Sequence, residues 1–158
     1  MGTNPILTVG DRAPSFALES DTQGTIRLED LKGQKVILYF YPKDMTPGCT
    51  NQACDFRDHK DTLQREGYTV FGVSPDPVDR HKKFREKHDL NFPLLADTDH
   101  AVAEAYGVWR EKTNYGKTYT GLVRSTFFID EEGVIEAIYD NVRAKGHVAR
   151  LVREITEG

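Results

Sequence analysis

The chain contains two cysteines, Cys49 and Cys54, and sulfur chemistry is the first function that they suggest. Two cysteines are too few to staple a secreted scaffold, so we expect their value to be chemical. Thr46 is a candidate helix N-cap, and Pro47 suits the first position of a helix. Cys49 would then lie in the first helical turn. There, unpaired backbone N–H groups and the positive end of the helix dipole favour the reactive thiolate.

The spacing of the two cysteines limits how they can react with each other. On one regular helix, positions five apart are separated by a rise of about 7.5 Å and a rotation of about 140°. A disulfide requires Cα atoms about 4.4 to 6.8 Å apart. A Cys49–Cys54 disulfide would therefore require the first turns of the helix to open. Gly48 and Asn51 are poor helix formers, which makes that opening easier.

The element before the cysteines is predicted to be a buried strand. Residues Val36 to Tyr41 are six consecutive apolar or aromatic side chains rich in strand formers, typical of a strand covered on both faces. Pro42 ends this run. The helix that carries both cysteines then continues until Gly67, which is placed to end it. The sequence therefore predicts a strand, a turn and a helix start at the reactive thiol.

The remaining elements are predicted from periodicity and turn signals. They are an extended arm (1–14), a hairpin (15–19 and 25–28, turning at 21–24), a turn or one-turn helix (29–34), a strand (68–74), a helix (78–88) capped by Asp76, a strand-like segment (92–96), a helix (101–106) capped by Asp99, a loop or irregular hairpin edge (108–121), a strand pair (125–130 and 134–139) and a final helix (145–155). This order predicts an α/β fold, an open mixed sheet with helices on both faces. A length of 158 residues predicts one domain, 1–158.

Composition disfavours several classes of function. The formal charge of −4 comes from 25 acidic and 21 basic residues mixed along the chain, so there is no basic stripe for nucleic acid. No apolar segment has the length needed to span a bilayer, and residues 1–10 lack the features of a signal peptide. A cytoplasmic location is the expectation that follows.

Metal binding is disfavoured by residue spacing. Zinc sites usually place paired cysteines two to four residues apart and need four ligands, which Cys49, Cys54 and His59 do not provide. Asp97-Thr98-Asp99 lacks the glycine and later glutamate of a calcium loop, so we interpret it as helix capping. The five histidines show no ligand spacing, and each is interpreted as a solvent-exposed helix or cap residue: His59, His81, His88, His100 and His147.

The run YFYPKDMTPGCT, from Tyr39 to Thr50, resembles the active-site signature of the peroxiredoxins: proline, three residues, threonine, two residues, cysteine. Cys54, the segment GLVRSTFFID (121–130) and the segment FPLLAD (92–97) are similar to the bacterioferritin-comigratory, or Q-type, branch of that family. The match extends over nearly the whole chain. It implies a thioredoxin-like fold with an added N-terminal β-hairpin, a choice that periodicity alone does not make.

The same resemblance implies a cofactor-free thiol peroxidase and assigns roles to six residues. They are Cys49 as the peroxidatic nucleophile, Cys54 as the resolving thiol, Thr46 with the backbone amides of Gly48 and Cys49 as the peroxide-binding groups, Arg124 as the cation facing the thiolate, and Pro42 as a shield. The implied substrates are hydrogen peroxide and organic hydroperoxides. Thioredoxin or a similar dithiol protein would reduce the resulting disulfide, and the protein would act as a monomer.

Other interpretations remain open at this point. Cys54 could be a small buried apolar residue in a one-cysteine cycle that uses an outside thiol. Thr46 could serve as an N-cap alone, Pro42 as a strand terminator and Arg124 as a surface ion-pair partner. A thiol–disulfide oxidoreductase is weakened by the absence of a C-x-x-C motif. A peroxide sensor or holdase is a further alternative, in which opening of the helix exposes an apolar surface.

Overall fold

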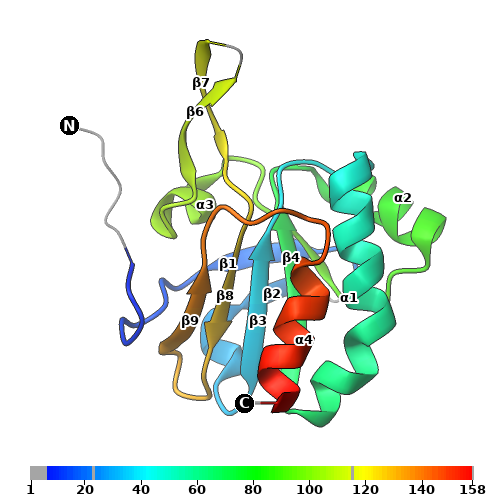
Figure 1. Ribbon diagram of the computed structural model, residues 1–158, viewed down its shortest axis with the longest axis vertical. Helices are drawn as coiled ribbons and strands as arrows, with labels where there is room; N and C mark the ends of the chain where they lie inside the picture. Colours follow the sequence, from blue (N-terminus) through cyan, green and yellow to red (C-terminus); the bar gives the residue numbers. More distant parts are fainter. Residues whose placement is uncertain (1–6, 23, 115, 158) are drawn as a thin grey trace.

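A seven-stranded sheet forms the centre of the computed structural model, which describes residues 7–22, 24–114 and 116–157 (Figure 1). Its strand order is β2-β1-β5-β4-β3-β8-β9. The strands are β1 (Ala17–Ser20), β2 (Thr25–Arg27), β3 (Lys35–Phe40), β4 (Tyr68–Ser74), β5 (Leu94–Ala96), β8 (Ser125–Ile129) and β9 (Ile135–Tyr139). β3, β4 and β5 run parallel, whereas β8, β9, β1 and β2 join by antiparallel pairing. The sheet is therefore mixed, as predicted.

Helices cover both faces of this sheet (Figure 1). They are α1 (Pro47–Arg65), α2 (Val78–His88), α3 (Ala101–Ala105), α4 (His147–Glu157) and the 3-10 helix η1 (Leu28–Leu31). Side chains of a strand alternate between its two faces. On β3, Ile37 and Tyr39 pack with α1, α2 and α4, while Leu38 and Phe40 pack with α3 and the N-terminal segment. This explains the uninterrupted apolar run in the sequence.

The N-terminal hairpin is present as predicted, with Leu18 paired to Ile26. Gln23, in the turn between its strands, and residues 1–6 of the predicted arm lie outside the described residues. The rest of the arm runs beside β9, where the amide of Gly10 donates to the carbonyl of Ile135 at 2.8 Å.

Strands β6 (Trp109–Asn114) and β7 (Lys117–Leu122) form a separate two-stranded antiparallel sheet. It projects from the body of the molecule (Figure 1), so the predicted irregular edge is a more regular hairpin than expected. Its base is fixed by a hydrogen bond from the amide of Val123 to the carbonyl of Val108 at 2.7 Å and by an Arg110–Asp140 ion pair at 2.7 Å. The hairpin leads directly into Arg124 and β8.

The predicted capping residues behave differently from each other. Asp99 accepts from the amide of Ala101 at 3.1 Å, and Asp97 accepts from the next two amides of α3, which confirms the capping interpretation. The prediction that Asp76 caps α2 is wrong, since Pro77 holds the N-cap position without a side-chain hydrogen bond. The Asp76 carboxylate instead accepts the amide of Asp44 at 2.7 Å, because the loop before α1 approaches it closely.

The expectation of solvent-exposed histidines is wrong at two positions. His81 on α2 is fully buried and His147 on α4 is 5% exposed. Each packs against the sheet because it has a polar partner there: the carboxylate of Asp44 for His81 and the hydroxyl of Thr126 for His147. Burial, followed by the nearby charges of Arg150 and Arg124, lowers the pKa of His147 to about 4.

Within the described residues, no helix combines the length and the apolar character that crossing a membrane would require.

Candidate active site

Cys49 lies in the first turn of α1, as the sequence predicts. Pro47 opens the helix, where its missing N–H leaves no donor unpaired. The Cys49 side chain is 1% exposed and packs against an apolar cluster that includes Tyr39 and Phe56. A sulfur atom in this position lies beside the helix N-terminus and is shielded from water, an arrangement that suits a thiolate provided that a cation compensates its charge.

Arg124 supplies that cation. Its Nη2 donates to the sulfur of Cys49 over 3.2 Å, although the two residues are 75 positions apart in the chain. β8 runs antiparallel to β3, and Ser125 pairs with Phe40. The residue before β8 is therefore brought to the same sheet edge as the loop that follows β3. Sequence spacing gave no sign of this contact, which only the family resemblance implied.

Gly48 lies directly beside the guanidinium of Arg124. A Cβ atom built on Gly48 would lie 3.4 Å from Nη2 of Arg124 and 3.7 Å from Cβ of Ala144, which is van der Waals contact with both. The loop after β9, which contains Ala144, therefore forms another side of the site. A larger residue at position 48 would compete with the guanidinium for space.

Gln52 holds the other side of the guanidinium, a role that sequence reasoning missed. Its Oε1 accepts from Nη1 of Arg124, and its side chain is fully buried. Gln52 follows Cys49 by three residues on the same helix, so the two side chains share a face. That spacing is the signal that could have identified it. The Nε2 of Gln52 has no hydrogen-bond partner among the described residues.

Thr46 occupies the N-cap position of α1, but its hydroxyl does not cap the helix. Oγ1 donates to the carbonyl of Lys43 at 2.9 Å instead of accepting from an amide of the first turn. With its hydrogen engaged, the Thr46 oxygen keeps its lone pairs free to accept a hydrogen bond. The preceding residue, Met45, has φ of 65°, an uncommon left-handed conformation for a residue with a side chain.

Pro42 and Cys54 occupy the positions that the sequence predicts for them. Pro42 follows the end of β3 and is half-buried, and its shielding role stays a prediction. Cys54 lies further along α1, is half-buried, and forms no disulfide with Cys49. Within the described ranges, no group of three or more histidine, cysteine or acidic side chains is arranged to hold a metal ion.

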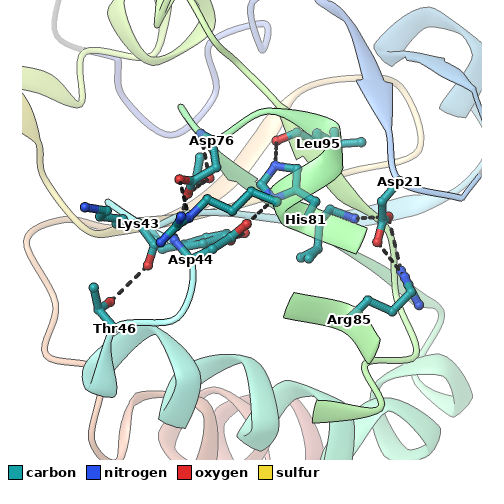
Figure 2. A network of polar contacts seen from close by, with 12 residues as sticks. Asp21, Lys43, Asp44, Thr46, Asp76, His81, Arg85 and Leu95 are labelled. Carbon is teal, nitrogen blue, oxygen red and sulfur yellow. Dashed lines mark hydrogen bonds and ion pairs between the residues drawn. The ribbon is translucent and has the colours of Figure 1, made fainter. Parts of the chain in front are cut away.

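A buried polar network holds the loop between β3 and α1 (Figure 2). The Asp44 carboxylate accepts from the hydroxyl of Tyr41 at 2.5 Å and lies 2.6 Å from Nδ1 of His81. Burial, and then the charge of Asp44, raise the pKa of Tyr41, so its hydroxyl stays protonated and donates. The loop before the thiol is therefore held through Asp44, independently of the contact between Arg124 and the sulfur.

Comparisons with known proteins identify the family of this chain. The model of the AhpC/TSA family matches residues 9–138. "Peroxiredoxin Bcp" of Bacillus subtilis is 46% identical over 151 residues, covering 96% of each chain, and "Peroxiredoxin Bcp" of Escherichia coli K12 is 48% identical over 144 residues, covering 91% of this chain and 92% of that protein. Among solved structures, a peroxiredoxin Q of Xanthomonas campestris has a TM-score of 0.84 with 34% identity, covering 90% of each chain.

The fold similarity extends over almost the full length. PrxQ of Xylella fastidiosa superposes with a TM-score of 0.89 at 30% identity, covering 97% of this chain and 98% of the other. The predicted thioredoxin-like arrangement is thereby confirmed. The matched region includes the strand, the loop, the helix start and the arginine described above. The chain therefore belongs to the AhpC/TSA family and is a peroxiredoxin that resembles the Bcp, or Q-type, members.

Proposed function

We propose that this protein is a thiol-dependent peroxidase that reduces hydrogen peroxide and organic hydroperoxides through Cys49. The observation that supports this most directly is the position of the Arg124 guanidinium, 3.2 Å from a sulfur atom that is almost fully buried. A buried thiolate needs a nearby positive charge to remain ionised. The guanidinium provides that charge, and the helix N-terminus adds a second favourable contribution.

The reaction starts with attack of the Cys49 thiolate on one peroxide oxygen. The O–O bond breaks, the sulfur is oxidised to a sulfenic acid, and the other oxygen leaves as hydroxide or alkoxide, which takes a proton to give water or an alcohol. The oxygen of Thr46 can accept a hydrogen bond from the peroxide. The backbone amides of Gly48 and Cys49 can donate to its oxygens. Arg124 stabilises the charge that develops on the leaving oxygen.

Cys54 is the proposed resolving thiol. Its sulfur attacks the sulfenic sulfur of Cys49, which forms the disulfide and releases water. Both cysteines lie on α1, so this step requires the first turns of the helix to unwind. Oxidation should therefore raise amide exchange between Cys49 and Cys54 while the central strands remain protected. An oxidised protein with an intact helix would favour a disulfide between molecules or a one-cysteine cycle.

A dithiol protein of the thioredoxin kind is the proposed reductant, and a hydroperoxide is the proposed substrate. The name of one structural neighbour supports the substrate class, since it describes alkyl peroxide reduction by the Xanthomonas campestris bacterioferritin comigratory protein, 33% identical to this chain. The monomeric state and the cytoplasmic location stay predictions.

The first experiment is rapid mixing of the reduced protein with one equivalent of hydrogen peroxide, followed by thiol counting and intact mass. The expected result is loss of both thiols and two hydrogens within one chain, much faster than free cysteine reacts. Loss of thiols at the rate of an ordinary cysteine would contradict the peroxidase. Capture of a partner on oxidation, with negligible turnover, would favour the sensor or holdase instead.

A further inference from the structure

The peptide group between Lys43 and Asp44 connects the active site to a buried carboxylate. Its C=O accepts the hydroxyl of Thr46 at 2.9 Å, and its N–H donates to Oδ2 of Asp76 at 2.7 Å (Figure 2). A peptide group is planar and rigid, so the position of Asp76 determines the direction of the carbonyl. The N–H bond to a carboxylate also strengthens the carbonyl as an acceptor, since hydrogen bonds in a chain polarise one another.

The side chain of Asp44 fixes the same peptide from a second direction. Its carboxylate is fully buried and lies between the hydroxyl of Tyr41, at 2.5 Å, and Nδ1 of His81, at 2.6 Å. The imidazole is itself held by α2 and by the carbonyl of Leu95, 3.0 Å from Nε2. We call Asp44, Asp76 and His81 the loop anchor.

The hydrogen-bond partners of His81 indicate where its protons and that of Asp44 lie. A backbone carbonyl can only accept, so Nε2 of His81 carries a hydrogen and donates to Leu95. Nδ1 of His81 and Oδ2 of Asp44 then share one further proton at 2.6 Å. With that proton the pair is neutral as a whole, as an imidazolium with a carboxylate or as an imidazole with a carboxylic acid. Because the pair has no net charge, its burial avoids the large desolvation cost of an unpaired ion.

The loop anchor and the groups that activate the sulfur form separate sets of hydrogen bonds. Arg124, just before β8, donates to Cys49 and to Gln52 of α1, whereas the hydrogen bonds of the loop anchor go to none of these three residues. Between the loop anchor and the helix start, Met45 has its left-handed conformation, which persists only where the surrounding structure holds it. Loss of the loop anchor would release this turn and move the Thr46 hydroxyl.

We propose that His81 and Asp76 are positioning residues for the peroxide reaction: through the Lys43–Asp44 peptide they hold the Thr46 hydroxyl where it can accept a hydrogen bond from the peroxide. This inference rests on the proposed peroxidase activity and extends it to residues on α2 and after β4. A displacement of about 1 Å in a positioning group can slow a reaction about 100-fold. The effect should appear in the reaction with peroxide and not in the activation of the thiol.

Two substitutions at position 81 separate the two hydrogen bonds of the imidazole. The amide of His81→Asn lies where Nδ1 lies and can keep the contact with Asp44. The amide of His81→Gln lies where Nε2 lies and keeps only the contact with Leu95. Both variants remove the ring, so both lose similar packing. Asp76→Ala removes the other arm of the loop anchor.

Arg85→Gln provides a control on the same helix. Arg85 follows His81 by four residues and pairs with another buried carboxylate, Asp21, at 2.5 Å (Figure 2). Its further hydrogen bonds go to carbonyls after α2, and none goes to the active-site loop. Arg85→Gln should therefore lower stability without changing the loop.

The measurement is the second-order rate of Cys49 oxidation by hydrogen peroxide, with the rate of alkylation by iodoacetamide at the same pH as the report on the thiolate. We expect oxidation to slow about 10- to 100-fold in His81→Gln and Asp76→Ala, with alkylation close to wild type. His81→Asn and Arg85→Gln should retain most of the oxidation rate.

Equal oxidation rates in His81→Gln and His81→Asn, or slowing in Arg85→Gln as large as that in His81→Gln, would overturn the positioning role. Alkylation slowed in parallel with oxidation would also overturn it, because the loop anchor would then act on the sulfur. Slow oxidation of the wild-type protein would instead refute the proposed peroxidase itself.

Discussion

The two cysteines share one helix but have different surroundings. Cys49, in the first turn of α1, is 1% exposed and receives a hydrogen bond from Arg124. Cys54, further along the same helix, is half-buried and forms no disulfide with Cys49. The residue type is the same, so the difference in expected reactivity comes from position. The sulfur of Cys49 is buried beside the helix N-terminus and receives a hydrogen bond from a guanidinium, whereas Cys54 lies further along the helix, is more open to solvent, and has Arg57 as a nearby charge.

This difference fits a division of roles. The nucleophile needs preorganised charge before the peroxide arrives. The resolving thiol needs only to meet the sulfenic sulfur after α1 unwinds, so a relatively open position suits it. Substitutions and acid can remove the difference between the two cysteines or isolate one of its causes.

Replacing the cysteines one at a time should give the largest difference. Cys49→Ser should abolish peroxide reduction, because a hydroxyl of serine is not ionised at neutral pH. Cys54→Ser should leave the first oxidation fast but allow sulfinic acid to accumulate at Cys49, since nothing captures the sulfenic acid. Rapid mixing followed by intact mass measures both outcomes. A Cys54→Ser protein as resistant to over-oxidation as the wild type would remove Cys54 from the resolving role.

Removing the cation should make Cys49 more like Cys54. Arg124→Gln should slow the reaction with peroxide about 100- to 1,000-fold, which corresponds to about 3 to 4 kcal/mol of lost transition-state stabilisation. Alkylation of Cys49 at neutral pH should slow as well. Arg143→Gln is a suitable control, because Arg143 is an exposed arginine next to Ala144 at the same site. If both variants react alike, general positive charge, and not this contact, activates the sulfur.

Acid should lower the stability of the folded protein, and so of the helix that carries both cysteines, because His147 is buried in its neutral form. The pKa of His147 is about 4 in the folded protein, below its ordinary value of about 6.5. The unfolded chain therefore binds a proton that the folded chain excludes, so stability falls as the pH drops through this range and is unaffected above it. The expected loss between about pH 7 and pH 4.5 is about 2 to 3 kcal/mol.

Urea unfolding of the wild type and of His147→Gln at both pH values tests this effect. The variant should lose less stability on acidification, because it lacks the titrating group. The result matters for the cysteines because α4 packs on α1, with Val148 and Leu151 in the same apolar cluster as Cys49. Equal acid sensitivity of the two proteins would assign the loss to carboxylates elsewhere.

Removing the hydrogen bond between Gln52 and Arg124 should have the smallest effect on the oxidation of Cys49. Gln52→Leu removes the oxygen that orients Nη1 of Arg124, and it also removes a buried amide nitrogen that lacks a partner. We expect oxidation of Cys49 about 10-fold slower, or about 1.4 kcal/mol, with stability maintained. Stopped-flow oxidation and urea unfolding give the two numbers. An unchanged oxidation rate would mean that Arg124 keeps its position beside Cys49 without the hydrogen bond to Gln52.

The local elements could be predicted from the sequence because their causes are local. The apolar run of β3, Pro47 at the helix start and the strand pair of β8 and β9 each depend on nearby residues, and all three are in place. The register that brings Arg124 to Cys49 depends on pairing between β3 and β8, which no short-range pattern encodes. The family resemblance was needed for that contact.

The buried histidines show where single-residue tendencies fail. His81 lies three residues before Phe84 on α2, so it shares the apolar face of a helix whose other residues are mostly charged. That position could have indicated burial. Its partner, Asp44, lies 37 residues away, so the polar contact that makes burial favourable could not be predicted from spacing. The sequence pattern assigned Asp76 to the cap of α2, because its actual partner, the amide of Asp44, also lies far away in the sequence.

The pairing of Ser125 with Phe40 also limits how the gene for this protein can change in length. A codon gained or lost within β3 or β8 would shift the pairing of these strands by one residue. The shift would turn side chains of the altered strand to the opposite face of the sheet and move Arg124 relative to Cys49. A length change between β6 and β7 would leave that register untouched, because those strands form a sheet of their own. Insertions and deletions should therefore be tolerated at the projecting hairpin and eliminated at the two strands that connect the arginine to the thiol.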